Sequence, residues 1–198
     1  INTAHGKINT PSFIFCGTKA TVKSVLPSQL KQARSQIILS NTYHLMLQPG
    51  PEIISKEGGL QNFTDWNGPM MTDSGGYQIF SLGYGSVSEE IKGKNNNTKR
   101  KSLIKINEDG ASFRNYLNGD KVFLSPERSI ELQRDFGADL IFVLDVCTPF
   151  NVSKKYTEKS MYMSHRWATR CKNSFESKFK NYESTFGSSG KQSLYGII

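Results

Sequence analysis

Short apolar runs alternate with amphipathic segments along most of the chain. The apolar runs predict strands at 12–17, 36–41, 69–74, 139–145 and 193–198. Segments 26–34 and 49–59 predict short helices, because each has Pro near its start and glycines follow the second. The run DLIFVLD at 139–145 lacks polar alternation, which is typical of a strand covered on both faces.

Segment 102–125 breaks this alternation. It contains alternating apolar positions and the turn dipeptides Asp109-Gly110 and Asn118-Gly119, which predict an antiparallel hairpin. The strand–helix alternation then resumes: Ser125 and Pro126 predict a helix start, and Gly137 predicts its end.

A long helix is predicted from about 153 to 182. Apolar side chains at helical spacing form one stripe, which is interpreted as core packing: Met161, Ala168, Cys171, Phe175, Phe179 and Tyr182. Cys171 is therefore expected to be structural.

Repeated strand–helix units predict an α/β fold with a parallel sheet and right-handed crossovers. A TIM (β/α)8 barrel needs about eight units and roughly 250 residues. The 198 residues supply about five or six such units and the hairpin insertion. The pattern therefore indicates either an open sheet or an incomplete barrel.

The charge balance adds a candidate partner. With 25 Lys and Arg against 17 Asp and Glu, the chain carries a formal charge of +8, which favours nucleic acid. A basic protein without such a partner is the alternative. Segment 92–102, KGKNNNTKRKS, is interpreted as a mobile loop that either contacts phosphates or is simply solvated.

The cysteines point to no disulfide framework and no metal site. Cys16, Cys147 and Cys171 lie far apart without a CxxC pair, as expected for reduced thiols. No hydrophobic signal segment precedes the first strand, and the longest apolar stretch, 140–146, is too short to span a membrane. A cytoplasmic protein without a membrane partner is expected.

Two carboxylates follow apolar runs in the same way. Asp73 and Asp145 each stand at or near the end of a predicted strand, and the carboxyl ends of parallel strands line the active-site face of α/β folds. The two acids are therefore predicted to converge. The alternative is that each merely caps the segment that follows it.

Small polar residues and an aromatic residue accompany these acids. Ser74, Gly75 and Gly76 would let a planar ligand approach the backbone, and Tyr77 offers a face for stacking. Cys147 and Thr148 follow the second acid. Together they predict a pocket for a polar planar ring. His44 is interpreted as a packed, hydrogen-bonded histidine rather than a metal ligand, and His5 and His165 show no partner pattern.

Several long blocks carry a family resemblance. TPSFIFCGTKATVKSVLPSQL, QIILSNTYHLMLQPG, MMTDSGGYQIFSL, FLSPERSIELQ and LDVCTP resemble tRNA-guanine transglycosylases (queuine tRNA-ribosyltransferases) of the bacterial type, over about residues 3–198. The resemblance implies a TIM barrel that exchanges the wobble guanine of certain tRNAs for a 7-deazaguanine, either preQ1 or queuine.

The resemblance also assigns roles within this sequence. It implies that Asp73 is the acid/base carboxylate, that residues 74–77 form the base pocket with Tyr77 stacking, and that Asp145 and Cys147 recognise the purine edge. The chemistry agrees, because breaking an N-glycosidic bond needs one group to manage the protons of the base. A carboxylate also suits the N–H and NH2 edge of guanine.

The resemblance implies that residues 1–198 are the N-terminal part of a single barrel domain, with the C-terminal half and zinc subdomain absent. No cofactor is expected in this chain, because the ligands of the structural zinc in full-length relatives lie in that absent part. The expected partners are the tRNA anticodon loop, guanine or a 7-deazaguanine, a separate C-terminal half and a second copy in a homodimer. The isolated chain is expected to be inactive, because the nucleophilic aspartate is missing.

Two alternatives stay open at this point. One is a catalytically dead remnant or an accessory half that binds base or tRNA. The other is an unrelated barrel glycosidase that uses Asp73 and Asp145 as its acid and nucleophile.

Overall fold

The computed structural model describes residues 1–84, 104–149, 152–179 and 192–198. Its strands are β1 Asn2–Thr3, β2 Gly6–Lys7, β3 Phe15–Cys16, β4 Ile38–Ser40, β5 Met70–Thr72, β6 Lys105–Asn107, β7 Gly110–Arg114, β8 Lys121–Leu124, β9 Leu140–Phe142 and β10 Ser193–Tyr195. Its helices are α1 Pro27–Gln32, α2 Thr42–Leu47, α3 Pro51–Lys56, α4 Leu60–Thr64, α5 Gly76–Tyr84, α7 Pro126–Phe136 and α8 Lys154–Phe179.

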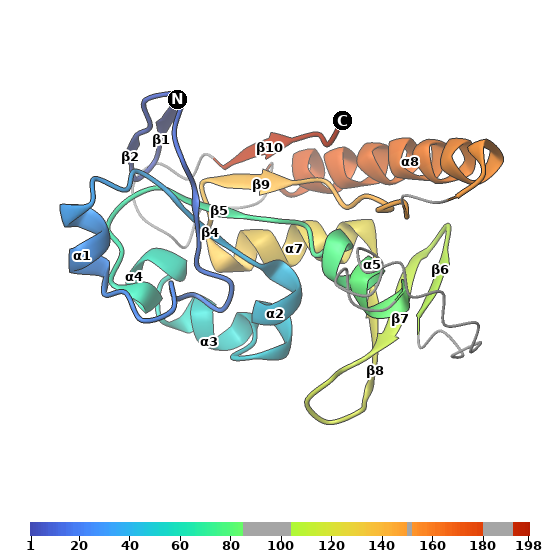
Figure 1. Cartoon of the computed structure of the whole chain (residues 1–198), viewed down its shortest axis with the longest axis horizontal. Helices are drawn as coiled ribbons and strands as arrows, with labels where there is room; N and C mark the ends of the chain where they lie inside the picture. Colours follow the sequence, from blue (N-terminus) through green and yellow to red (C-terminus); the bar gives the residue numbers. More distant parts are fainter. Residues whose placement is uncertain (85–103, 150–151, 180–191) are drawn as a thin grey trace.

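A five-stranded parallel sheet organises the molecule (Figure 1). The strand order is β10-β9-β5-β4-β3, so neighbours in the sheet also follow one another in sequence, apart from the insertion β6–β8 between β5 and β9. Helices α2, α3, α7 and α8 form a connected layer, since α7 contacts the other three. The predicted α/β class and parallel sheet are confirmed. A closed barrel is not present in the part of the chain that the structure describes.

The predicted insertion is a three-stranded antiparallel sheet. β6 pairs with β7 and β7 with β8, at the lower right of Figure 1. Gly110 adopts φ +153° and its added Cβ would lie 2.4 Å from the main-chain oxygen of Leu124, so a side chain has no space at this turn. The hairpin prediction is therefore confirmed, with one strand more than a simple hairpin.

The predicted limits of α7 are also confirmed. Ser125 accepts the N–H of Arg128 at 3.2 Å, Pro126 occupies the first turn, and Gly137 ends the helix in the left-handed region with φ 74°. The sequence analysis did not predict α2, α4 or α5, which are short and lie close to glycines or to a strand.

The stripe on α8 differs from the prediction at its start. Met163, Trp167 and Cys171 are buried, whereas Met161 is 43% exposed. At 3.6 residues per turn Met161 lies about 160° around the helix from the buried Met163, so it is on the other side of α8. Cys171 is structural as predicted: its Sγ accepts the N–H of Leu144 at 3.3 Å, and burial raises the pKa of its thiol to about 11.

The rest of the predicted stripe is only partly described. Ala168 and Phe175 are half-buried against the main core. Nothing is described of the Phe179 side chain, and Tyr182 and the predicted loop 92–102 lie outside the described residues.

The two faces of the parallel sheet are covered unequally. Ile38, Met70 and Ile141 belong to the large core shared with the helices. The residues that alternate with them, Leu39, Met71 and Phe142, are only half-buried. The prediction that 139–145 is covered on both faces is confirmed at Leu140, which is buried with Ile8 and Ile37 in a second small core, and at the buried Ile141 on the opposite face. Within β9 only Phe142 is half-buried.

Asp139 ties the amino ends of the strands together. This buried carboxylate accepts the N–H of Met70 at 3.0 Å and the side-chain amide of Gln61 at 3.2 Å. His5, for which the sequence showed no partner, places Nδ1 2.9 Å from the same carboxylate, and this hydrogen bond raises the pKa of His5. The N-terminal segment is thereby anchored to the sheet.

No described helix is both long and apolar enough to cross a bilayer.

The raised pKa of His5 predicts a pH-dependent stability. Its contribution is present below the unfolded-state pKa of about 6.5 and is lost as the pH rises through the higher folded-state pKa. We expect His5→Gln to lower the free energy of unfolding more at pH 5 than at pH 9, by less than about 1 kcal/mol because the ring is partly exposed. Urea titrations at both values test this, with His165→Gln on the exposed side of α8 as the control. An equal loss at both values would contradict it.

Candidate active site

Asp73 follows β5 directly, and its carboxylate is held by four donors. Oδ1 accepts the backbone N–H groups of Thr42 at 3.0 Å and Gly75 at 3.2 Å. Oδ2 accepts the side-chain amide of Asn41, and the side chain of Gln78 also donates to this carboxylate. The donors come from α2 and its cap residue Asn41, from Gly75 in the loop after β5, and from α5, so the segments before and after β5 both fix the acid in place.

Burial and hydrogen bonding have opposite effects on Asp73. Burial raises its pKa, whereas the hydrogen bonds from Thr42, Gly75, Gln78 and Asn41 lower it. Burial is the larger influence, and the pKa of Asp73 rises to about 6. A carboxyl group with this pKa can hold or release a proton near neutral pH, as general acid–base catalysis requires.

Asp145 packs directly against the segment that follows Asp73. The side chain of Ser74 hydrogen-bonds to the Asp145 carboxylate. A Cβ added at Gly76 would lie 2.8 Å from both the main-chain oxygen and Oδ1 of Asp145. Burial raises the pKa of Asp145, opposed by hydrogen bonds from Ser74 and from its own N–H. The structure thus brings Asp73 and Asp145 to one site, joined through Ser74 and Gly76.

Asp145 does not end a strand, contrary to the prediction. β9 ends at Phe142, three residues before it. Beyond that point side chains of α8 pair with the backbone, since Val146 donates its N–H to Ser164 Oγ at 2.9 Å. Regular strand pairing stops because these side chains take the place of a neighbouring strand.

The remaining predicted site residues lie near the two acids in sequence and differ in exposure. Ser74, Gly75 and Gly76 are buried. Tyr77, in the first turn of α5, is 49% exposed, and its ring centre lies 6.3 Å from that of Phe80. Cys147 is half-buried, two residues beyond Asp145. The stacking role of Tyr77 and the recognition role of Cys147 stay predictions.

No role in the site was predicted for Asn41, Thr42 or Gln78, which hold Asp73. A signal for Asn41 was available, because Asn is a preferred helix cap and its Oδ1 accepts the N–H of His44 at 3.1 Å. That signal depended on recognising α2, whose six residues are too short for a clear helical period.

An aromatic cluster adjoins Asp73. The ring of His44 lies 5.2 Å from that of Tyr43 and 6.0 Å from that of Tyr116, so its predicted packing is confirmed. The prediction that the His44 ring is hydrogen-bonded is wrong for its Nδ1 atom. That atom, Tyr43 Oη and Gln78 Oε1 are buried without a hydrogen-bond partner among the residues that the structure places. Burial lowers the pKa of the His44 imidazole.

Among the residues that the structure describes, no group of three or more His, Cys, Asp or Glu side chains could hold a metal ion.

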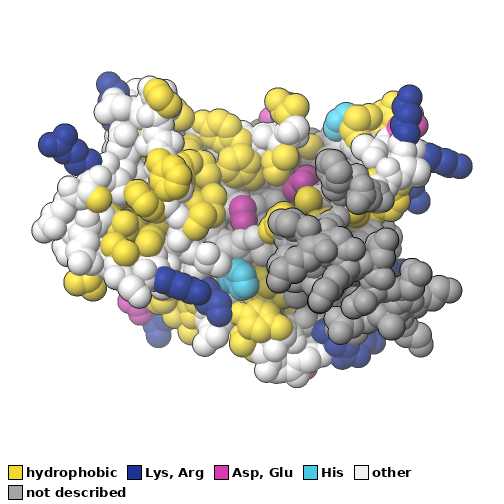
Figure 2. Space-filling view, in the orientation of Figure 1, with side chains coloured by type: hydrophobic (Ala, Val, Ile, Leu, Met, Phe, Trp, Pro, Cys, Tyr) yellow, Lys and Arg dark blue, Asp and Glu magenta, His cyan; other side chains and the backbone are white. Residues whose placement is uncertain are grey.

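The face shown in Figure 2 gathers these kinds of side chain. Acidic side chains and a histidine lie near its centre, bordered by hydrophobic side chains. Half-buried acids beside buried glycines and exposed aromatic rings suit a ligand that is both planar and polar.

Comparison with known proteins decides the family. The family model described as "Queuine tRNA-ribosyltransferase" matches residues 1–198. The chain belongs to the queuine tRNA-ribosyltransferase family. This membership contradicts the alternative of an unrelated barrel glycosidase.

Individual family members show how much of the length is shared. The chain is 45% identical over 198 residues to a queuine tRNA-ribosyltransferase of Staphylococcus haemolyticus (strain JCSC1435), covering 100% of this chain and 45% of that protein. It is 45% identical over 172 residues to one of Roseiflexus sp. (strain RS-1), covering 86% and 43%. The chain therefore spans less than half the length of these curated relatives.

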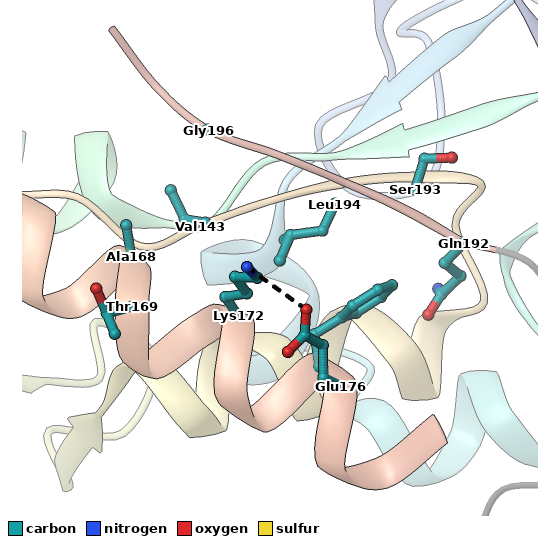
Figure 3. A pocket seen from close by; sticks show the side chains of 10 residues that line it. Val143, Ala168, Thr169, Lys172, Glu176, Gln192, Ser193, Leu194 and Gly196 are labelled. Carbon is teal, nitrogen blue, oxygen red and sulfur yellow. Dashed lines mark ion pairs between the residues drawn. The ribbon is translucent and has the colours of Figure 1, made fainter. Parts of the chain in front are cut away.

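A cleft lies away from the two acids, at the edge of the sheet. It encloses about 590 Å³ between β10 and α8, with Val143, Ala168 and Leu194 among its apolar lining (Figure 3). Lys172 and Glu176 form an ion pair of 3.7 Å at its border. Neither Asp73 nor Asp145 lines this cleft. The candidate active site is therefore identified from the hydrogen bonds around the two acids and not from the volume of a cavity.

Gly76 provides a test of the packing between its segment and Asp145. Gly76→Ala favours the helix intrinsically, yet its Cβ would meet main-chain and carboxylate oxygens at 2.8 Å. We expect a loss of about 1–3 kcal/mol in the free energy of unfolding, measured by denaturant titration. Gly196→Ala is the control, because nothing lies within 4 Å of its added Cβ. A neutral or stabilising Gly76→Ala would show that the segment does not press on Asp145.

Proposed function

We propose that this chain supplies the base-binding part of an enzyme that exchanges guanine at the wobble position of tRNA for a 7-deazaguanine, preQ1 or queuine. The observation that carries the proposal is the meeting of Asp73 and Asp145 at one site in a member of this family. The net charge of +8 supports a polyanionic substrate.

Asp73 is the proposed acid and base. When the bond between ribose C1′ and guanine N9 breaks, C1′ bonds to the nucleophilic aspartate expected outside this chain, and the protonated Asp73 carboxyl delivers a proton to the leaving base. The resulting carboxylate then takes the N9 proton of the incoming 7-deazaguanine, whose N9 displaces that nucleophile from C1′, so bonds and protons balance over one exchange. The pKa of about 6 supports both halves of this cycle near neutral pH.

Asp145 is the proposed acceptor for the N–H and NH2 edge of the base. Ser74 orients that carboxylate, and Gly75 and Gly76 leave room for the ring, on which Tyr77 would stack. Cys147 is placed by this proposal at the purine edge. No cofactor is proposed for residues 1–198, and the structural zinc expected in full-length relatives would be held by ligands outside them.

We further propose that the parallel sheet is part of a (β/α)8 barrel. Consecutive strands are spatial neighbours, as in a singly wound barrel and unlike a doubly wound sheet. The half-buried Leu39, Met71 and Phe142 would face the barrel interior. The open edge of β10 and the cleft beside it would receive further strand–helix units, in the same polypeptide or in a separate C-terminal half. The homodimer and the inactivity of the isolated chain stay predictions.

The first test concerns Asp73 and uses the complete gene product. Asp73→Asn is expected to lower guanine exchange into tRNA by about 10²–10⁴-fold while the thermal unfolding midpoint stays close to that of the wild type. Incorporation of labelled guanine measures this, with the exposed Asp65→Asn as a control of unchanged activity. Substantial exchange by Asp73→Asn would refute the acid–base role.

The pH dependence follows from the raised pKa. Accepting the proton of the incoming base requires ionised Asp73, so kcat/KM for that base should fall as the pH drops below about 6, by about tenfold per unit. Rates measured between pH 4.5 and 8 test this. A limb centred near the ordinary aspartate pKa of about 4 would contradict the proposed state of Asp73.

The second test concerns Asp145. Asp145→Ala removes the acceptor for the base and is expected to weaken guanine binding at least about tenfold, the cost of one or more hydrogen bonds to a charged group. Calorimetric titration of guanine into the complete gene product measures this. Asp120→Ala, on the exposed turn between β7 and β8, is the control. Equal affinity of wild type and Asp145→Ala would remove Asp145 from the base site.

A further inference from the structure

The ladder between β5 and β9 stops after one pair, Met71 opposite Leu140. If this register continued, Asp73 would lie opposite Phe142, and the main chain around Asp73 would bond to Phe142. Phe142 instead directs its N–H and C=O to a side chain. The missing strand pair closest to this end of the ladder is therefore the one that would contain Asp73, the candidate catalytic acid.

The side-chain amide of Gln133 makes the hydrogen bonds to Phe142 that the main chain of β5 would otherwise make. Its Oε1 accepts the N–H of Phe142 at 2.9 Å, and its Nε2 donates to the C=O of Phe142 at 2.8 Å. One amide therefore satisfies both main-chain groups of Phe142, as a residue of a neighbouring strand would. Oε1 also accepts the hydroxyl of Thr72 at 3.1 Å, and Gln133 is completely buried.

Ser129, one turn earlier on α7, extends the same arrangement toward β5. Its hydroxyl donates to the main-chain oxygen of Ser74 at 2.9 Å. Gln133 Nε2 lies 3.3 Å from that hydroxyl, so the two side chains form one network. Side chains of α7 thus hold the segment after β5 on one side and β9 on the other.

This replacement has a geometric consequence for residues 73–76. Because their main chain is not paired with β9, it can turn at Gly75, where φ is +87°. The turn lets Asp73 accept from Thr42 while Ser74 and Gly76 reach Asp145. A continued ladder would hold this segment extended against Phe142.

We propose that Gln133 is a positioning residue of the base site: its amide takes the place of the 72–74 main chain in the ladder with β9 and so sets where residues 73–76 meet Asp145. This inference rests on the proposed function. The competing explanation is that Gln133 only satisfies buried main-chain groups, which would affect stability alone.

The test compares two buried glutamines in the complete gene product. Gln133→Met removes the amide at the carboxyl ends of the strands. Gln61→Met removes a similarly buried amide, 5% exposed, that bonds to Asp139 at the amino ends. Each is made in the wild-type and in the Asp145→Asn background, with the thermal midpoint and the guanine dissociation constant measured for all.

Both substitutions are expected to lower the thermal midpoint. Gln133→Met should also weaken guanine binding about tenfold in the wild-type background. In the Asp145→Asn background the loss should be less than about twofold, because the contact of guanine with the Asp145 carboxylate, which Gln133→Met disturbs, is already removed. Gln61→Met should leave guanine affinity within about twofold in both backgrounds. Amide hydrogen exchange without ligand should be faster at Gly75 and Gly76 in Gln133→Met only.

The outcomes separate this inference from the proposed function. Equal loss of affinity by both glutamine variants, or the same loss for Gln133→Met in both backgrounds, would overturn the positioning role. Unchanged exchange at Gly75 and Gly76 in Gln133→Met would overturn it as well. A wild type that neither binds guanine nor exchanges it would contradict the proposed function. The hydrogen-exchange result would still decide whether Gln133 fixes the conformation of residues 73–76.

Discussion

The early end of pairing between β5 and β9 is the constraint on which the candidate site depends. Parallel strands normally lie about 4.8 Å apart and continue side by side, which would hold the chain after β5 extended against β9. Here the two strands share one pair, and an amide from α7 replaces the next. The released segment turns through two glycines and connects the half-buried Asp73 to the half-buried Asp145. The helix layer therefore shapes the site as well as covering the sheet.

Burial and hydrogen bonding then give the two acids their properties. Asp73 is surrounded by donors, yet burial outweighs them and raises its pKa into the range useful for proton transfer. Asp145 is also shifted upward by burial and has fewer donors. A ligand with N–H groups would supply the hydrogen bonds that Asp145 lacks, which is the physical reason to place a nucleobase there. Gln78, which bonds to Asp73, keeps its Oε1 without a hydrogen-bond partner among the described residues.

The sequence predicted the parts of this arrangement that have a local signal. Apolar runs located the parallel strands, turn dipeptides located the antiparallel insertion, and Ser125 and Gly137 located the ends of α7. Asp73 and Asp145 stood out because acids after apolar runs are unusual. Gln133 and Asn41 could not be found in this way, since their roles depend on contacts across the sheet. The short helices α2 and α4 were missed because they lack the proline in the first turn that marked the similarly short α1 and α3. Asp145 was misplaced at a strand end because side chains pair with the backbone there.

Asp73 and Asp145 are proposed to act on one heterocycle, and a crystal structure of the complete gene product with bound guanine decides this. We expect the carboxylates of Asp73 and Asp145 to lie within about 3.2 Å of polar atoms of the same base, with the segment 74–76 against its ring. A base bound elsewhere, or one that contacts a single carboxylate while the other faces solvent, would contradict it.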